Sequence, residues 1–295
     1  MHYGIRTQVD LSRKIEKEYD VAIGFMEGWS THFVASNKVK AYKKFVWVHP
    51  QYHSCFLIPE IDKKAFNKVC GISLVDKKCK EQFIKYFPKF QNKVNIIPNI
   101  LSEKFVLEKA NEEIKYNFQD KINICTICRI DIHVKGLDRL INVIKKLKTE
   151  NLCNNIIWHV IGDGNEFSVF ERKIIENKLN DVVILHGMKK NPYPYLVRMD
   201  AFVLMSRYEG KPVSVTEAEI LNVPCLVTEY SAASSQIKNY YNGIIMKNSE
   251  AEIYETIKKI IEEPNILKLL KTNLLYDHYG NECDIELFYK MIDSD

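Results

Sequence analysis

Hydrophobic and polar positions alternate in blocks from about residue 120 onward. Continuous apolar runs, typical of buried strands, lie at residues 121–128, 155–162, 181–187, 201–205, 224–230 and 243–246. Between them, apolar positions recur at helical spacing, which predicts helices at residues 136–148, 166–178, 193–199, 215–222 and 234–241. Strict alternation of this kind predicts a parallel sheet covered on both faces. With right-handed crossovers, this half is a doubly wound, Rossmann-like domain.

The first half of the chain repeats the alternation more loosely. Strands are expected at residues 20–25, 44–48, 66–72 and 93–98, and a helix with one apolar face at residues 73–87. A polar stretch without strong period, residues 109–121, marks the expected junction, and residues 249–276 read as helical. The expected organisation is a first Rossmann-like domain over residues 1–118, a second over 119–262, and C-terminal helices over 263–295 that could pack back on the first.

Composition narrows the class of protein. The chain has 295 residues and a net charge of +4, with the basic residues dispersed, which argues against a nucleic-acid partner. The N-terminus has no signal-peptide pattern and no apolar run reaches the length of a membrane span, so a cytoplasmic protein with at most peripheral membrane contact is expected. Eight scattered cysteines suit a reducing compartment. Cys125 and Cys128 form a C-x-x-C inside an apolar strand, which favours core packing over a metal or redox site.

Polar clusters follow the predicted strands of the second half. They are Arg129 with Lys135 and Gly136; Gly162, Asp163 and Gly164; and His186 with Gly187. The carboxyl ends of parallel strands border the cleft in which such sheets bind ligands. Arg129 and Lys135 are two cations beside a helix N-terminus, a combination that suits a diphosphate, although either could be an exposed loop charge. The glycine cluster by itself predicts only a tight turn, and His186 by itself a residue at a strand end.

A further cluster, SRYEGKPVSVTEAEIL, follows the strand at residues 201–205. Its two acids, Glu209 and Glu217, are too far apart on a helix to share a face, so we expect Glu209 in a loop and Glu217 in the first turn of a helix. Ser214 and Glu217 fit a capping box, which would explain Glu217 without any ligand. An acid at this position can also accept hydrogen bonds from a ribose diol. Pattern alone therefore predicts a nucleotide-like anion in a cleft.

In order and spacing, these residues resemble a known family. The pattern is similar to that of family 4 of the retaining glycosyltransferases. It consists of Arg129 with Lys135-Gly136-Leu137-Asp138, then the glycine cluster at Gly162, then His186-Gly187, then Glu209-Gly210 through Glu217-Ala218. The resemblance covers residues 120–250. It implies the GT-B fold, an α/β architecture of two Rossmann-like doubly wound parallel-sheet domains facing a cleft, and transfer of a sugar from a nucleotide-sugar donor with retention at the anomeric carbon.

Roles for individual residues follow from the resemblance. Arg129 and Lys135 would hold the donor diphosphate and stabilise it as leaving group, Glu217 would bind the ribose, and Glu209 would face the donor sugar. The turn through Gly210, Lys211, Pro212 and Val213 would offer backbone amides, and Gly162 and His186 would line the donor site. His49, with His53 as runner-up, would contact the sugar near the reacting carbon. The family commonly works without a bound metal, so no cofactor and no metal ligand is expected.

The sequence departs from the family pattern in three places. In the loop after the first strand of the second half, Cys128 stands where the family usually has glycine, and the stretch from Arg129 to Lys135 is one residue longer than its common form. In the second place, Lys211 replaces an aromatic or apolar residue and adds a positive charge near the donor. The third departure is larger: residues 20–33 resemble a segment well inside the first domain, so the initial strand and its glycine-rich loop are expected to be absent and the first domain incomplete.

The expected function is a cytoplasmic hexosyltransferase, with a uridine diphosphate sugar as donor, that extends a surface glycan or lipid-linked saccharide of the capsule or lipopolysaccharide kind. A non-catalytic nucleotide-sugar-binding remnant or partner subunit is the alternative. Another enzyme of the same fold, such as an epimerase or phosphorylase, is a third hypothesis.

Overall fold

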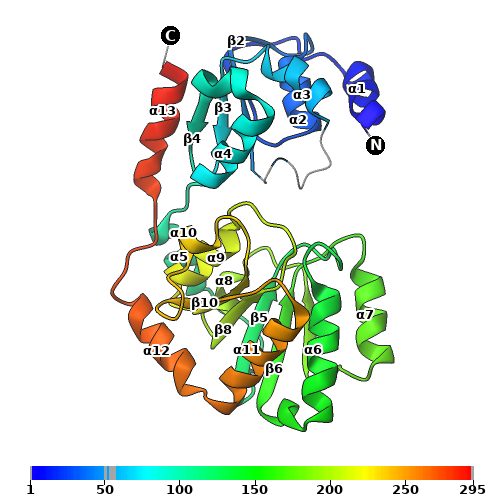
Figure 1. Cartoon of the computed structure of the whole chain (residues 1–295), viewed down its shortest axis with the longest axis vertical. Coiled ribbons are helices and arrows are strands. Elements are labelled where there is room, and N and C mark those ends of the chain that lie inside the picture. Colours follow the sequence, from blue (N-terminus) through cyan, green and yellow to red (C-terminus); the bar gives the residue numbers. More distant parts are fainter. Residues whose placement is uncertain (1, 50–51, 53–57, 294–295) are drawn as a thin grey trace. The chain divides into compact units, whose positions relative to one another are not determined.

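A computed structural model describes residues 2–49, 52 and 58–293. The chain forms two compact units (Figure 1). The first consists of Met1–Ile100, Glu209–Lys211 and Glu282–Asp295, and the second of Leu101–Tyr208 and Pro212–Asn281. Each contains one parallel sheet flanked by helices, which confirms the predicted α/β fold class.

The first unit is built on a four-stranded sheet with strand order β1-β2-β3-β4. Its strands are β1 (Glu18–Gly24), β2 (Lys40–Val48), β3 (Gly71–Leu74) and β4 (Val94–Ile96). Its helices are α1 (His2–Leu11), α2 (Trp29–Ala35), α3 (Pro59–Phe66), α4 (Lys77–Tyr86) and α13 (Ile285–Asp293), with 3₁₀ turns η2 (Pro88–Lys93) and η4 (Glu282–Asp284). The order is consecutive, so the sheet does not reverse its winding within the described strands.

The last helix of the chain belongs to the first unit. Met291 of α13 is buried in the same apolar cluster as Phe45 and Trp47 of β2, and Lys43 Nζ donates to the Ile292 carbonyl at 3.0 Å. Helix α12 (Asn265–Leu274) belongs instead to the second unit, where Leu267 and Leu270 are in the core. The predicted C-terminal segment from residue 263 is thus divided between the units.

The second unit contains a six-stranded sheet. Its strands are β5 (Ile122–Ile127), β6 (Ile156–Ile161), β7 (Val183–Gly187), β8 (Ala201–Leu204), β9 (Cys225–Thr228) and β10 (Gly243–Met246). Its helices, besides α12, are α5 (Glu103–Ala110), α6 (Leu137–Thr149), α7 (Phe167–Glu176), α8 (Tyr193–Leu196), α9 (Val213–Ile220), α10 (Ala233–Gln236) and α11 (Glu250–Glu262), with the 3₁₀ turn η3 (Leu152–Asn155).

The order of these strands reverses in the middle of the sheet. It is β10-β9-β8-β5-β6-β7 with all pairs parallel, which is the 3-2-1-4-5-6 order of a doubly wound dinucleotide-binding domain. From β5 the chain winds to one edge, and from β8 it winds to the other. The prediction of a doubly wound second half is therefore confirmed strand by strand.

Apolar side chains of the second unit form one cluster on each face of the sheet. One face carries Leu140 of α6, Trp158, Phe170 of α7, Ile253 of α11 and Leu267 of α12. The other carries Val106 of α5, Leu196 of α8, Val215 of α9 and Ala233 of α10. Because Val106 and Ala110 are buried there, the unit begins at Leu101, earlier than the boundary expected after residue 118.

Cys125 and Cys128 pack toward different clusters. Cys125 is fully buried with the α5, α8 and α9 side chains, and burial raises the pKa of its thiol. Cys128 packs against the other cluster. The predicted core role of this C-x-x-C is confirmed. No helix among the described residues is long and apolar enough to cross a membrane.

Candidate functional site

The reversal of strand order lies between β5 and β8, which pair through Ile124 with Ala201 and Cys125 with Phe202. At such a reversal the helices that follow the two strands lie on opposite faces of the sheet, and the loops leading to them diverge. The loops concerned are residues 128–136 after β5 and residues 205–212 before α9. Ligands of open α/β sheets bind outside the strand ends at this point, and both loops carry residues that the sequence singled out.

Asp131 organises the loop after β5. Its carbonyl accepts from the Lys135 backbone N at 3.0 Å, and its Oδ1 accepts from the Val134 backbone N at 3.1 Å. Arg129 Nη2 lies 3.7 Å from Asp131 Oδ2, but the Arg129 side chain is 72% exposed. An exposed ion pair of this kind contributes about 0–1 kcal/mol, so a phosphate can compete for the guanidinium.

Gly136 joins this loop to the loop after β8. It adopts a left-handed conformation (φ 69°) immediately before α6, and a Cβ at this position would lie 2.1 Å from the Met205 carbonyl oxygen. Only glycine allows both the backbone conformation and the close approach. Gly136 therefore lets the two loops of the switch point touch, and its neighbour Lys135 lies next to the helix start.

Gly162 makes an equally close approach on the other side of β5. Its φ is 147°, and a Cβ would lie 1.8 Å from the Cys128 carbonyl oxygen. The Ile130 backbone N donates to the Asp163 carbonyl at 2.9 Å, so the loop after β5 and the loop after β6 are also linked by a hydrogen bond. The structure thus gives Gly162 a packing function, while the donor contact implied by the resemblance stays a prediction.

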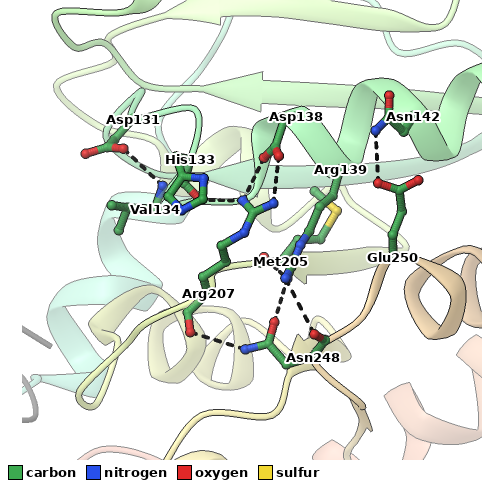
Figure 2. A network of polar contacts seen from close by, with 10 residues as sticks. All are labelled: Asp131, His133, Val134, Asp138, Arg139, Asn142, Met205, Arg207, Asn248 and Glu250. Atoms are coloured by element: carbon green, nitrogen blue, oxygen red, sulfur yellow. Dashed lines mark hydrogen bonds and ion pairs between the residues drawn. The ribbon is translucent and has the colours of Figure 1, made fainter.

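An arginine that the sequence did not single out connects the switch-point loops (Figure 2). Arg207 donates from Nη1 and Nη2 to the two carboxylate oxygens of Asp138, at 2.8 and 2.7 Å, in a bidentate pair. Its Nη1 also donates to the His133 carbonyl at 2.6 Å, and its backbone N donates to the Val134 carbonyl at 2.9 Å. Arg207 therefore fixes the loop after β8 to both the Lys135 loop and the first turn of α6.

A second arginine extends the network to the loop after β10 (Figure 2). Arg139 Nη1 donates to the Met205 carbonyl at 3.2 Å and to Asn248 Oδ1 at 2.6 Å. Asn248 Nδ2 in turn donates to the Arg207 carbonyl at 3.2 Å. Three strand-end loops are thereby cross-linked by two buried or half-buried arginines.

The charges of this network are matched internally. Burial by itself raises the pKa of Asp138, but the hydrogen bonds and charge of Arg207 outweigh it and hold that pKa below its usual value. The hydrogen bond to Asp138 likewise raises the pKa of Arg207. Asp138 stands inside the quoted motif, but nothing in the sequence paired it with Arg207.

Glu217 does not form the capping box that the spacing allowed. Helix α9 begins at Val213 with Pro212 as N-cap, so Ser214 lies inside the helix and Glu217 in its second turn. The Glu217 Oε1 instead accepts from the Tyr193 hydroxyl at 2.7 Å. Desolvation raises the pKa of Glu217, and the Tyr193 hydrogen bond opposes this shift. The capping-box alternative for Glu217 and its expected place in the first turn of the helix are therefore wrong, and Tyr193 is a partner that sequence reasoning missed.

The start of α9 is anchored by α10. Gln236 Nε2 donates to the Pro212 carbonyl and to Thr216 Oγ1, both at 3.1 Å. The preceding residues Glu209, Gly210 and Lys211 group with the first unit. Glu209 and Glu217, the two acids of the quoted stretch, are thus assigned to different units, and the roles implied for the Gly210–Val213 turn stay predictions.

His186 lies near the end of β7 with its ring in a packed cluster. Asn123 Nδ2 donates to the carbonyls of Gln119 and Lys121, which leaves its Oδ1 as acceptor for His159 Nε2 at 3.0 Å. His159 Nδ1 must then accept from His186 Nε2, at 2.9 Å. Desolvation lowers the pKa of both rings to about 4. The Nε2 hydrogen of neutral His186 is thus used within this cluster, and the contact to the nucleotide-sugar donor that the resemblance implies stays a prediction.

His49 follows β2 in the first unit and pairs with an acid. Its backbone N donates to Glu27 Oε2 at 3.3 Å, and its Nδ1 lies 3.8 Å from the same oxygen. Burial raises the pKa of Glu27, but the contacts with His49 outweigh it and the net shift is downward. Phe25 and Trp47 flank the imidazole, with ring centroids 5.2 and 6.5 Å away. Glu27 had no role in the sequence reading, and His53 lies outside the described residues.

The chain matches the model of a known protein family. The profile of the family described as "Glycosyl transferases group 1" matches residues 108–274. This range covers more than half of the chain and contains Arg129, Lys135 and both acids of the SRYEGKPVSVTEAEIL stretch.

Two curated relatives and one solved structure illustrate the similarity. The chain is 27% identical over 267 residues to an uncharacterized glycosyltransferase of Methanocaldococcus jannaschii, covering 83% of this chain and 63% of the relative. It is 22% identical over 130 residues to a UDP-Gal:alpha-D-GlcNAc-diphosphoundecaprenol alpha-1,3-galactosyltransferase of Escherichia coli, covering 44% and 34%. It therefore spans less than two thirds of the length of either relative.

The solved structure is the Anabaena protein HepE in complex with UDP and glucose. It superposes with a TM-score of 0.75 at 12% identity, covering 99% of this chain and 80% of that one. At this identity the likeness concerns the fold, and it supports the GT-B type.

Proposed function

The chain belongs to the family of glycosyl transferases group 1, and on that premise we propose that it transfers a hexose from a nucleotide-sugar donor to a glycan or lipid-linked saccharide. The observation that carries this proposal is the switch point of the second sheet. There the strand order places a cation-bearing loop, held by Gly136 and Arg207, where open α/β sheets bind nucleotides.

The chemistry proposed for the second unit is electrostatic. Arg129 and Lys135 neutralise the two phosphates of the donor and stabilise the diphosphate as it departs from the sugar. The exposure of Arg129 and its weak pairing with Asp131 support this role, whereas Arg207 and Arg139 are committed to the loop network. Glu217 accepts hydrogen bonds from the ribose hydroxyls.

In the first unit, Glu209 and His49 take the contacts to the donor sugar that the family resemblance implies. The amides of Gly210 to Val213 serve as donors to the sugar or phosphate. Transfer proceeds with retention by a front-face substitution. In that reaction the leaving phosphate oxygen takes the acceptor proton as the new glycosidic bond forms and the bond to the diphosphate breaks. No side chain is assigned as general base. The positive charges of Arg129 and Lys135 supply the electrostatic stabilisation.

A uridine diphosphate sugar is the proposed donor. HepE is similar in fold and was solved with UDP and glucose, and the Escherichia coli relative is named for UDP-Gal. The name of that relative also supports a lipid-linked saccharide as acceptor. A cytoplasmic position, with peripheral contact to the inner face of the membrane, follows from such an acceptor.

Calorimetric titration with UDP tests the donor site. We expect the unmodified chain to bind UDP, Lys135→Ala and Arg129→Ala to weaken binding about tenfold each, and Glu217→Gln to weaken it by a similar factor, since a hydrogen bond involving a charged group contributes about 1.5–3 kcal/mol. Lys145→Ala is the matched control, because Lys145 is exposed on α6 and should leave the affinity unchanged.

Turnover separates the enzyme from a binding protein. Release of UDP from UDP-glucose or UDP-galactose in the presence of a diphosphoundecaprenol-linked sugar, lost in Arg129→Ala, would support a transferase. Binding of UDP without turnover on any acceptor would favour the non-catalytic nucleotide-sugar-binding alternative. Absence of binding by UDP, GDP and ADP would contradict both.

A further inference from the structure

The Glu217 carboxylate has fewer hydrogen bonds than a half-buried acid usually receives. Among the described residues, the Tyr193 hydroxyl is the one donor to it, and that bond goes to Oε1. An ionised carboxylate accepts about four hydrogen bonds, and a desolvated one is costly when they are not made. The Oε2 oxygen is therefore the atom that can accept a hydrogen bond from a hydroxyl of a ligand.

Tyr193 is fixed in place by hydrogen bonds of its main chain and by packing of its ring. It is the first residue of α8, and its backbone N donates to Asn191 Oδ1 at 3.2 Å, which fixes the main chain at this position. Asn191 Nδ2 donates to the Lys109 carbonyl of α5 at 2.8 Å. The Tyr193 ring packs partly buried against the cluster that contains Val106 of α5 and Val215 of α9.

This arrangement restricts the orientation of the acid. The terminal torsion of a glutamate is broad, so an unsupported carboxylate samples many orientations. A fixed hydroxyl 2.7 Å from Oε1 selects one of them and leaves Oε2 in a defined direction. A receptor oriented before the ligand arrives does not lose that ordering entropy on binding.

We propose that Tyr193 is a positioning residue that orients Glu217 for the two hydroxyls of a ribose and so makes the donor site selective for ribonucleotides over deoxyribonucleotides. The inference rests on the proposed function, in which Glu217 binds the ribose, and adds the residue that sets its geometry. In this proposal Tyr193 acts through its hydrogen bond to Glu217 and is assigned no contact of its own to the reacting carbon or the phosphates. A deoxyribose lacks one donor, so it leaves the oriented carboxylate incompletely paired in a desolvated position.

The test compares dissociation constants for UDP, 2′-deoxy-UDP and 3′-deoxy-UDP, measured by calorimetry on the full chain. The unmodified chain should bind UDP about tenfold more tightly than at least one of the deoxy forms, the factor expected for one hydrogen bond to a charged group. Tyr193→Phe should weaken UDP about five- to tenfold while changing that deoxy form less than twofold, so that discrimination collapses. Glu217→Gln should reduce the discrimination in the same way.

Tyr195→Phe is the matched control. Tyr195 lies on the same short helix, and its ring packs against His186 while its hydroxyl has no hydrogen bond among the described residues. This variant should retain both the UDP affinity and the discrimination. It separates the hydroxyl at position 193 from any general effect of a tyrosine-to-phenylalanine change in α8.

Each remaining outcome contradicts a specific step. If Tyr193→Phe keeps the preference for UDP, or weakens UDP and both deoxy forms by the same factor, Tyr193 does not orient the ribose acceptor and the inference fails while the proposed function stands. If Glu217→Gln binds UDP and both deoxy forms as the unmodified chain does, Glu217 is not the ribose ligand. If UDP, GDP and ADP all fail to bind the unmodified chain, the proposed function fails and this inference with it.

Discussion

The loops at the strand ends are stabilised by different kinds of contact in the two units, each considered by itself. In the second unit, Arg207 and Arg139 connect three loops through charged hydrogen bonds to Asp138, Asn248 and main-chain carbonyls. In the first unit, His49 is flanked by the rings of Phe25 and Trp47 and touches one acid, Glu27.

The difference teaches which charges are available to a ligand. Loops fixed by a closed network present the exposed guanidinium of Arg129 in a constant place, which suits a rigid diphosphate. The His49 imidazole lies between aromatic rings, and among the described residues Glu27 is its acid partner at 3.8 Å, so we expect it to change contacts at little cost. We expect substitutions in the second unit to be costly and their counterparts in the first to be mild.

The largest effect is expected where the switch-point loops touch. Gly136→Ala places a Cβ 2.1 Å from the Met205 carbonyl oxygen at a φ of 69°, so backbone strain and a main-chain clash add up to about 3 kcal/mol or more of destabilisation. Gly187→Ala is the matched control, because Gly187 has a φ of 65° with nothing within 4 Å. It should lose only the conformational part, about 1–2 kcal/mol. Equal losses in urea unfolding would contradict a close contact at Gly136.

Acid should weaken the second unit through its histidine pair. The folded-state pKa values of His159 and His186 lie at about 4, below the ordinary 6.5, so the unfolded chain takes up protons first. Stability then falls as the pH drops from about 7 towards about 4, and it levels off below that. Between pH 7 and pH 5 each ring would lose about 2 kcal/mol before solvent screening, and the loss for the pair after screening is of the order of 2–3 kcal/mol.

Urea midpoints at pH 7 and pH 5 measure this dependence. His186→Asn should reduce it, whereas His133→Asn, at an exposed position, should not. A pH dependence that survives in His186→Asn unchanged would show that other groups are responsible.

Loss of the bidentate pair should be the next largest effect. Arg207→Ala leaves Asp138 partly buried without its partner and opens the link to the His133 carbonyl, which should cost about 1–2 kcal/mol after allowance for solvent screening. Arg207→Lys should recover only part of this, because an ammonium cannot make the fork. Arg172→Ala, at an exposed position on α7, is the control and should change the urea midpoint little.

The smallest effect is expected in the first unit. Glu27→Gln keeps the shape of the side chain and an acceptor for the His49 backbone N, so it should cost less than about 1 kcal/mol. The depressed pKa of Glu27 means that the carboxylate stabilises the fold above its ordinary pKa of 4.5 and that this contribution disappears as the pH falls further. If Glu27→Gln proved as destabilising as Arg207→Ala, the contrast between the two units would not hold.

The sequence alone determined the architecture of the second half. Continuous apolar strands such as residues 156–161 alternate with amphipathic helices such as α6, and that periodicity is a local property of the chain. The strand-end positions of Arg129, Lys135 and Glu217 followed from the same alternation. The core role of Cys125 followed because a strand that is apolar along its whole length is buried on both faces, so a cysteine within it is buried as well.

Only the tertiary structure decided the partners of these residues. Spacing made Ser214 the natural partner of Glu217, yet the helix starts two residues too early for a capping box and Tyr193, 24 positions away, takes its place. Arg207 and Asp138 are 69 positions apart and meet because β5 and β8 are neighbours in a reversed sheet. The reason is physical: periodicity is set by neighbours along the chain, whereas a hydrogen bond between strand-end loops depends on strand order, which the fold as a whole determines.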